Sequence, residues 1–463
     1  MSNAEKARQL TVAYIGGGSR GWAWGLMKDL ALDRDLCGTV RLYDIDREAA
    51  ERNRIIGGII SSQPETVSPW KYEVSSSLQE ALTGADFVVI SILPGTFDEM
   101  ASDVHLPERL GIWQPVGDTV GAGGFMRAMR TIPMFAQIGE AIRECAPEAW
   151  VINYTNPMAL CVRTLYHVFP GIRAFGCCHE VFGTQELLCS ILKTEEGIDG
   201  VRRQDLRTDV TGINHFTWLT AASWQGTDLF PIYTRFAEKY AGTGYDAGGS
   251  DNWMNSHFSC AHRVKIDLFR RYGAIAAAGD RHLAEFTAPR YTRDPETIRS
   301  WKFSLTPVSW RKQDLKERLQ RSDNLISGKE KPDMKPSGEE GHLLLKALLG
   351  LGDLVSNVNL PNRGQIPNLP MGAVVETNAR FAEGRIDPLP AGPLPDSLLP
   401  MIARHVENQG NTLEAALRCD RELGFSTFMN DPQLDGVSLP EGKALFDDMI
   451  KNQRAYLPAG WFA

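Results

Sequence analysis

The sequence predicts an α/β fold in which a parallel sheet in the N-terminal half is followed by a C-terminal α+β domain. Two observations carry this prediction. Short apolar runs alternate with helical stretches over the first 200 residues, and this alternation stops beyond about Gly200. The chain is also 463 residues long, which is more than one hydrophobic core usually organises. We therefore expect residues 1–200 and 201–463 to form two domains.

Five apolar runs in the first half predict the buried strands of this sheet. They occupy residues 10–15, 39–43, 85–92, 149–154 and 173–177. Residues 22–32 and 47–61, which lie between strands, have helical character. Strands that alternate with helices form right-handed βαβ units, and consecutive units of this kind produce a parallel sheet.

The composition excludes collagen-like, disordered and disulfide-scaffold proteins. It is 43% hydrophobic and 23% charged, which is typical of a globular chain. The net charge of −8 disfavours nucleic acid and anionic membranes as partners, and no apolar run is long enough to span a bilayer. The eight cysteines are scattered and the first ten residues are polar, so we expect free thiols and a cytoplasmic location.

A glycine-rich motif, GGGSRG, directly follows the first predicted strand and precedes the first predicted helix. Gly16, Gly18 and Gly21 match G-x-G-x-x-G, whose glycines allow a tight turn, close approach of a pyrophosphate, and close helix–sheet packing. Asp44 ends the second strand, where a carboxylate favours NAD over NADP by accepting hydrogen bonds from the ribose. We expect these residues and Ser19 to bind NAD in a Rossmann-like domain. Alternatively, the glycines only form turns and Asp44 caps a helix.

Two further strand ends carry residues suited to a nucleotide crevice. Ser91 and Pro94 lie at the end of the strand at 85–92, and Asn153 and Asn156 lie at the end of the strand at 149–154. Ligands of open α/β sheets bind at the carboxyl ends of the strands. We expect Ser91 and Pro94 to lie along the cofactor and the asparagines to bind ribose or sugar hydroxyls, although Asn-Pro is also an ordinary turn signal.

Cys178 follows the strand at 173–177, and His215 lies further along the chain in the segment GINH. Their separation does not match a zinc finger. A thiolate and an imidazole are nevertheless suitable ligands for an open catalytic metal site that substrate oxygens and water complete. A buried cysteine and a hydrogen-bonded structural histidine are the more frequent alternative.

These motifs together resemble glycoside hydrolase family 4, the NAD- and metal-dependent glycosidases that are distantly related to lactate and malate dehydrogenases. The CHEV sequence at 178–181 is similar to that of α-galacturonidases. The resemblance covers most of the chain, in the segments AYIGGGSRGW (13–22), VGDTVGAGGFMRAMRTIP (116–133), INYTNP (152–157), CCHEVFG (177–183), GINHFTW (212–218), AGDRHLAEF (278–286) and NLPNRGQIPNLPMGAVVE (359–376).

The resemblance implies a ligand set. Cys178 and His215 are expected to bind a divalent metal, usually manganese. Asn156 is expected to hold the sugar, and Asn153 to lie by the nicotinamide or its ribose. Gly123 and Gly124 are expected near the nicotinamide, and a homodimer or homotetramer is expected in solution.

The resemblance also implies a redox-gated elimination, unlike the two-carboxylate route of most glycosidases. Sugar C3 is oxidised by NAD⁺, which makes the C2 proton acidic. A base removes that proton while the metal stabilises the enediolate. The C1 leaving group then departs with the help of an acid, water adds at C1, and C3 is reduced again.

Several residues are candidates for the acid and the base. Asp280 is the first candidate for the base, and His282 and Tyr291 are alternatives. Asp280 is equally typical of an N-cap for a helix that starts at Arg281. His179 stands where phosphosugar members place an acid, so we expect it to protonate the leaving oxygen or bind the sugar. Its alternative role is to orient the metal-binding cysteine.

A uronate substrate requires a cation for its C6 carboxylate, and arginine can bind a carboxylate through two hydrogen bonds. Arg130, Arg281 and Arg290 are candidates for this role, and Glu180 is a further candidate for contact with the sugar.

We therefore predict an NAD- and Mn²⁺-dependent α-glycosidase that acts on α-galacturonides derived from pectin. The alternatives are an α-glucuronidase or α-glucosidase of the same family and, from a different class, an NAD-dependent dehydrogenase of sugar or hydroxy acids.

Overall fold

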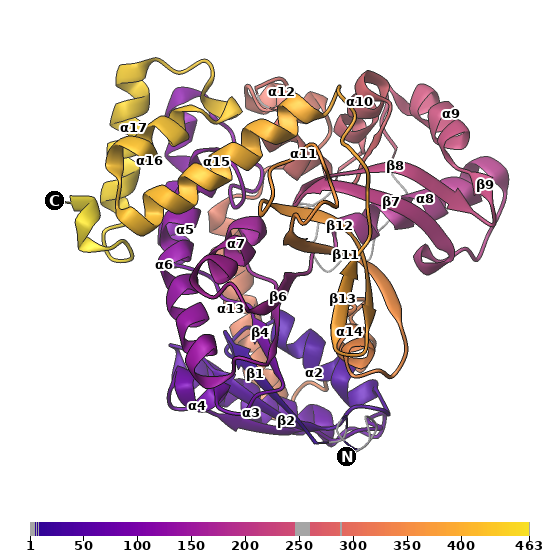
Figure 1. Cartoon of the computed structure of the whole chain (residues 1–463), viewed down its shortest axis with the longest axis vertical. Helices are drawn as coiled ribbons and strands as arrows, with labels where there is room; N and C mark the ends of the chain where they lie inside the picture. The colour runs from indigo at the N-terminus through magenta and orange to yellow at the C-terminus, as the bar shows by residue number, and fades with distance from the viewer. Residues whose placement is uncertain (1–4, 6, 8, 246–259, 288, 463) are drawn as a thin grey trace.

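The computed structural model describes residues 5, 7, 9–245, 260–287 and 289–462 (Figure 1). Its larger sheet has the strand order β13-β12-β11-β6-β5-β4-β1-β2-β3. The part from β3 to β6 is parallel and has the dinucleotide-binding order 3-2-1-4-5-6, which confirms the predicted Rossmann-like fold. Its strands are β1 (Leu10–Ile15), β2 (Gly38–Tyr43), β3 (Lys71–Val74), β4 (Phe87–Ile90), β5 (Trp150–Asn153) and β6 (Arg173–Gly176).

All five strands predicted in this half are present, with ends that differ by at most two residues. The central strand β4 has the sequence FVVI and is buried along its whole length, as expected for a parallel strand that is covered on both faces. Strand β3 was not predicted, because its sequence KYEV is short and its first residue is exposed at the sheet edge.

The helices of this half are α2 (Trp22–Leu32), α3 (Arg47–Ser61), α4 (Leu78–Leu82), α5 (Phe97–His105), α6 (Gly121–Cys145), α7 (Met158–Val168) and α8 (Glu180–Glu196). The predicted helices at 22–32 and 47–61 have the predicted bounds. The start of α3 is fixed by Asp46, whose side chain accepts a hydrogen bond from the Ala49 N–H.

The second half begins with a small sheet of β7 (Leu206–Ile213), β8 (Phe216–Trp224), β9 (Thr227–Asp228) and β10 (Ile275–Ala276), whose pairings are antiparallel. The helices that follow include α9 (Phe230–Tyr240), α10 (Arg263–Tyr272), α11 (Asp280–Phe286), α12 (Pro295–Ser300), α13 (Val308–Ile326) and α14 (Gly341–Leu348). This mixture agrees with the predicted α+β character.

Three strands of the second half extend the sheet of the first. They are β11 (Leu354–Pro361), β12 (Val374–Ala382) and β13 (Arg385–Pro388), and β11 pairs antiparallel with β6 through Asn359 and Gly176. The last helices, α15 (Leu399–Arg418), α16 (Arg421–Met429) and α17 (Leu439–Asn452), return to the first half, where α15 packs against α6 (Figure 1). The two sequence halves are therefore interleaved in space.

No helix among the described residues is both long enough and apolar enough to cross a lipid bilayer.

The turn after β1 generates a testable prediction. Gly16 has φ +90°, and a Cβ at this position would lie 2.0 Å from the Ser91 carbonyl oxygen. Gly16→Ala is expected to lower the free energy of unfolding by about 3 kcal/mol or more, because strain and a backbone clash add together.

Gly58→Ala is the matched control, because Gly58 is exposed on α3 and no atom lies within 4 Å of its added Cβ. This control is expected to raise stability by about 0.5–1 kcal/mol. Urea unfolding checks both values, and a Gly16→Ala variant as stable as the wild type would contradict the turn geometry.

Candidate active site

The glycine motif and Asp44 form one compact loop. Asp44 Oδ2 accepts a hydrogen bond of 2.8 Å from the Gly18 N–H, and a Cβ on Gly18 would lie 2.9 Å from the same oxygen. Asp44 Oδ1 accepts a further bond from the Asp46 N–H. Because a carboxylate can accept about four hydrogen bonds, Asp44 retains capacity for ribose hydroxyls. The loop is thus a cradle that side chains would fill, and it fits a dinucleotide.

Gly21 has a different role from the one that the motif predicts. We expected it to allow close packing of the helix on the sheet, but a Cβ at Gly21 would meet the Arg318 guanidinium at 2.6 Å. Gly17 makes the close contact with β2 instead, because its Cβ would lie 2.8 Å from that of Leu42. The space at Gly21 is occupied by the Arg318 side chain from α13, and the sequence motif does not predict this long-range contact.

The loop after β4 is held by Arg130. The Arg130 Nε donates to the Pro94 carbonyl oxygen at 3.3 Å, while its two Nη atoms bind the Asp103 carboxylate at 3.1 and 2.7 Å. The Arg130 side chain is 1% exposed and also contacts Gln453. The structure therefore does not bring Arg130 to a substrate carboxylate, and its bonds fix the loop that carries Ser91 and Pro94.

The two asparagines at the end of β5 differ in their hydrogen bonds. The Asn153 amide is fully buried and exchanges two hydrogen bonds with the backbone of Thr155. Asn156 donates from Nδ2 to Asp118 Oδ2 at 3.2 Å, while its Oδ1 is buried without a hydrogen-bond partner among the described residues. Asn156 therefore has a free acceptor in its Oδ1 atom, whereas the Asn153 amide stabilises the turn at Thr155.

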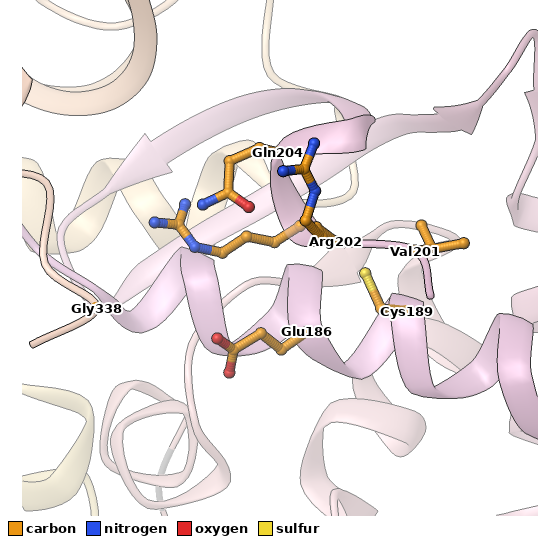
Figure 2. Close-up of a pocket in the computed structure, with 7 residues that line it drawn as sticks. Glu186, Cys189, Val201, Arg202, Gln204 and Gly338 are labelled. Atoms are coloured by element: carbon orange, nitrogen blue, oxygen red, sulfur yellow. The ribbon is translucent and has the colours of Figure 1, made fainter. Parts of the chain in front are cut away.

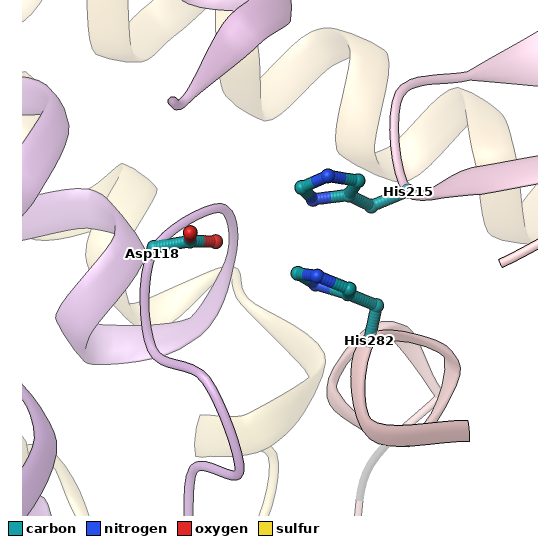
Figure 3. A group of neighbouring side chains, drawn as sticks. All are labelled: Asp118, His215 and His282. Atoms are coloured by element: carbon teal, nitrogen blue, oxygen red, sulfur yellow. The ribbon is translucent and has the colours of Figure 1, made fainter. Parts of the chain in front are cut away.

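Three side chains from distant segments meet at the centre of the site (Figure 3). Asp118 lies in the loop before α6, His215 in the turn between β7 and β8, and His282 on α11. The two imidazoles are stacked, with ring centroids 3.7 Å apart, and each of the three residues offers a ligand atom within 4.8 Å of the others. Such a set of nitrogen and oxygen donors suits a divalent cation.

A hydrogen-bond chain orients His215. The Thr119 hydroxyl lies 2.7 Å from Asp118 Oδ1 and 2.8 Å from His215 Nδ1. The Asp118 pKa is held below its usual range by His282, Arg127 and His215, which outweigh the effect of burial, so Asp118 is ionised. Because the hydroxyl has one proton and donates it to Asp118, it accepts from the His215 Nδ1–H. The His215 Nε2 lone pair is then available to a metal.

Glu180 lies close to His282, whose ring also stacks on His215. Its Oε2 accepts from the Gly279 N–H at 2.6 Å, and its Oε1 lies 3.6 Å from His282 Nε2. Burial alone would raise the Glu180 pKa, but the imidazoles of His282 and His215 lower it to about 2. Glu180 is therefore an anion that orients an imidazole, and a contact with the sugar remains a prediction.

Cys178 lies beside Asn214, the residue before His215. Burial and the carboxylates of Glu376 and Glu180 raise the pKa of its thiol well above the usual value. Glu376 is itself held by Thr217 at 2.9 Å and by Asn357 at 2.7 Å. A divalent cation would offset this crowding of negative groups and favour the thiolate.

Unpaired polar atoms around this centre also fit a ligand. Oδ1 of Asn156 and Nδ1 of His282 are buried without a hydrogen-bond partner in the part of the chain that the structure describes. Buried polar atoms are normally satisfied, so these groups indicate missing partners such as sugar hydroxyls or metal-bound water. A thiolate at Cys178 and an imidazole at His215 are chemically suited to a divalent metal, but the ligand atoms that converge with His215 among the described residues are those of Asp118 and His282.

The structure separates the candidates for the base. Asp280 accepts hydrogen bonds from the N–H groups of Val264 and Lys265, so it caps α10, whereas the predicted alternative had it cap its own helix. Burial raises its pKa to about 6. His282 is two residues further along α11 and points to the opposite side, toward His215. The Tyr291 hydroxyl donates to Asp267 at 2.6 Å.

The remaining predicted residues lie at the edges of the site. His179 precedes α8, with its ring 5.7 Å from that of Trp22 and its Nδ1 3.4 Å from Glu339. Arg281 is buried, and its guanidinium binds the carbonyl oxygens of Ser304 and Pro115. Arg290 is exposed and lies over the ring of Tyr291. Of the three arginines, Arg281 is the one adjacent to the segment that carries Asp118.

Gly123 and Gly124 are buried in the first turn of α6, where an added Cβ would meet backbone atoms of Asp103 and Thr119 at 2.8 and 2.4 Å. They allow close packing of this helix, and their proximity to a nicotinamide stays a prediction.

Sequence reasoning missed Asp118, Thr119 and Glu376 as functional residues, although all three lie in motifs that it singled out. Aspartate and threonine next to glycines are also common in plain turns, so residue type alone did not separate them. Glu376 lies within a strand, and only its contacts with buried residues in the fold indicate that it belongs to the site.

A hollow of about 420 Å³ lies along α8, and neither His215 nor His282 is among its lining residues (Figure 2). Two of its arginines are already paired, Arg202 with Asp205 and Arg203 with Glu340. We assign it no role, since both of its arginines are already paired.

Comparison with known proteins gives consistent matches along the chain. The family model described as family 4 glycosyl hydrolase matches residues 11–194, and the model of the family 4 glycosyl hydrolase C-terminal domain matches residues 210–434. The chain is 57% identical over 457 residues to the α-galacturonidase of Thermoanaerobacterium saccharolyticum, with 98% of each chain covered. The crystal structure of lplD from Bacillus subtilis, which is 52% identical, matches with a TM-score of 0.91 over 96% of this chain and 100% of lplD.

More distant structures share the fold. The 6-phospho-β-glucosidase of Thermotoga maritima, solved with manganese, NAD⁺ and glucose-6-phosphate, has a TM-score of 0.77 at 19% identity, with 96% of this chain and 99% of that chain covered. Malate dehydrogenase from Naegleria fowleri has a TM-score of 0.50 at 11% identity, with 89% and 99% covered. The predicted dehydrogenase-like fold is confirmed.

The loop that carries Asp118 generates a pH prediction. Glu285 Oε1 accepts hydrogen bonds from the N–H groups of Val116 and Gly117, and burial raises the Glu285 pKa to about 8. Because the folded pKa exceeds the ordinary value of 4.5, the stabilisation that this group provides is complete below about pH 4.5 and is lost as the pH rises toward 8.

Glu285→Gln cannot ionise. The difference in unfolding free energy between this variant and the wild type should change with pH between 4.5 and 8, in favour of the variant at higher pH, by up to about 1.4 kcal/mol per pH unit. Urea unfolding at several pH values measures it. Parallel pH profiles for the two proteins would contradict the prediction.

Proposed function

Because the chain belongs to glycosyl hydrolase family 4, we propose that it hydrolyses α-galacturonides with NAD and a divalent metal, Mn²⁺ in the first instance. The observation that carries this proposal is the 57% identity to an α-galacturonidase over 98% of both chains. The cluster of Asp118, His215 and His282 and the glycine loop suited to a dinucleotide support it, since the reaction needs a metal, a base and a redox cofactor. The homodimer or homotetramer stays a prediction.

The cofactors have defined places in this proposal. The loop from Gly16 to Gly21 and Asp44 would hold NAD, and Cys178 and His215 would hold the metal. When bound, NAD supplies reversible hydride acceptance at sugar C3, and the metal supplies Lewis-acid stabilisation of the neighbouring oxygens.

His282 is our choice for the group that accepts the C2 proton. It is stacked on the metal ligand His215, so it lies next to oxygens that a metal at His215 would bind. Glu180 lies 3.6 Å from His282 Nε2 and stabilises the imidazolium that proton acceptance creates. Asp280 is less suitable, since both of its oxygens cap α10.

His179 is placed to protonate the leaving oxygen. Its side chain is 41% exposed at the edge of the site, and Glu339 lies 3.4 Å from its Nδ1. A carboxylate at this distance can orient the ring. An exposed acid also suits a leaving group that extends toward solvent.

The sugar is held by Asn156 and Arg281 in our proposal. The unpaired Oδ1 of Asn156 accepts from a ring hydroxyl. Arg281, fixed by backbone carbonyl oxygens, supplies the positive charge that a C6 carboxylate requires.

A panel of 4-nitrophenyl α- and β-glycosides and uronides, assayed with NAD and Mn²⁺ under reducing conditions, tests the proposed function. We expect hydrolysis of the α-galacturonide with many turnovers per NAD and no net NADH. Stoichiometric NADH without release of nitrophenol would instead identify a dehydrogenase.

The proton step has its own prediction. In D₂O the product should carry deuterium at C2, and His282→Gln should lower turnover, and with it the rate at which labelled product forms, by roughly 10²–10⁴-fold. Asp280→Asn, the comparison variant, should lower thermal stability and still give labelled product. Mass spectrometry or NMR of the sugar measures the label, and formation of labelled product by His282→Gln at the wild-type rate would exclude His282 as the base.

Specificity for the uronate is tested at Arg281. Arg281→Gln should lower kcat/KM for the α-galacturonide about a hundredfold more than for the α-galactoside, because only the former has a carboxylate. The exposed Arg290→Gln is the matched control and should leave the ratio unchanged. An equal loss on both substrates would assign Arg281 a purely structural role.

A further inference from the structure

Arg318 reaches the dinucleotide cradle from the other half of the chain. It lies on α13, and its Nη1 donates to the Arg20 carbonyl oxygen at 3.1 Å. Its guanidinium fills the space that a side chain at Gly21 would occupy. The sequence motif gives no sign of this contact, since Arg318 lies 298 positions from Arg20 in the chain.

Helix α13 contacts α2 and α3, the two helices that follow β1 and β2, at several points. Arg52 on α3 donates to Ser322 at 3.2 Å and forms an ion pair with Asp323. Arg321 lies over the ring of Trp24 on α2, with its Cζ 6.0 Å from the ring centroid. These contacts fix the position of α13 independently of Arg318. The Arg318 guanidinium is thus held at the start of α2 by a rigid support.

The start of α2 concentrates positive charge. Gly21, its N-cap, makes no side-chain capping bond, and the first turn contains no acidic residue. The N–H groups of a first helical turn have no acceptor within the helix, and the helix dipole makes this end positive. Arg20 and Arg318 add two cations at the same place. Their carboxylate contacts are Asp46, 3.9 Å from Arg20, and Asp314, 2.7 Å from Arg318.

Two arginines at a helix N-terminus oppose its dipole, and Asp46 and Asp314 offset only part of their charge, so an anion bound there would stabilise the arrangement further. The proposed cofactor brings a pyrophosphate to the glycine loop that Arg318 contacts. A guanidinium binds phosphate oxygens through charge-assisted hydrogen bonds.

We propose that Arg318 is a cofactor-binding residue that contacts the pyrophosphate of NAD. This inference rests on the proposed function only in taking NAD as the ligand. It also means that a residue of the second half completes the nucleotide site of the first.

Ligand titrations followed by calorimetry test the role of Arg318. Arg318→Ala should raise the Kd for NAD and for ADP roughly tenfold to a hundredfold, while adenosine, which has no phosphate, should bind within about twofold of the wild type. Arg318→Lys should recover part of the loss. Lys316→Ala, an exposed position on α13, is the matched control and should leave the Kd for NAD unchanged.

Asp314→Asn distinguishes phosphate binding by the Arg318 guanidinium from the packing of α13. This variant breaks the same ion pair as Arg318→Ala but retains the guanidinium. If Arg318 binds pyrophosphate, Asp314→Asn should bind NAD as tightly as the wild type or more tightly. If Arg318 only docks α13, both variants should weaken NAD binding together.

Two results would overturn this inference while leaving the proposed function intact. One is a wild-type Kd for NAD in Arg318→Ala, and the other is an equal loss for ADP and adenosine. A wild-type protein that binds no NAD would instead remove the proposed function itself.

Discussion

The site depends on one short helix, α11, which makes two contacts from the same face. Glu285 accepts two backbone hydrogen bonds from the loop that presents Asp118, and His282, three residues earlier, stacks on His215. Residues three apart on a helix lie side by side, so one helix brings both neighbours to the same point. The cost of ordering these loops is offset by burial, and loss of the Glu285 acceptor would leave two buried backbone N–H groups unpaired, which is strongly destabilising.

The halves of the chain are joined in several other ways. Strand β11 continues the sheet beyond β6, which places Asn357 close enough to donate to the Cys178 carbonyl oxygen at 3.1 Å. Arg130 ties the loop after β4 to α5 through Asp103 and reaches Gln453 near the C-terminus. The nucleotide cradle and the imidazole cluster are therefore parts of one continuous packing arrangement, and movement of one half would disturb both.

The sequence predicted the parallel sheet accurately, because buried strands such as FVVI and the glycine loop after β1 have strong local signals. It did not predict that β11–β13 extend this sheet, since their pairing with β6 depends on residues distant in the chain. The family resemblance of the segment GDRH ranked Asp280 above His282 as a base. Their directions depend on which neighbour each faces, and only the fold shows that Asp280 caps α10 while His282 meets His215. Arg130 likewise matched the chemistry of a carboxylate ligand, but Asp103 already fills that role.

Cobalt substitution offers the most direct test of a metal held by Cys178 and His215. A cobalt–thiolate bond gives charge-transfer absorption in the near ultraviolet, so the spectrum reports the thiol ligand without any assay of turnover. The Co²⁺-loaded protein is expected to show this band, and Cys178→Ser is expected to lose it. The neighbouring Cys177→Ser should retain it. Retention of the band in Cys178→Ser would contradict the assignment of the metal site.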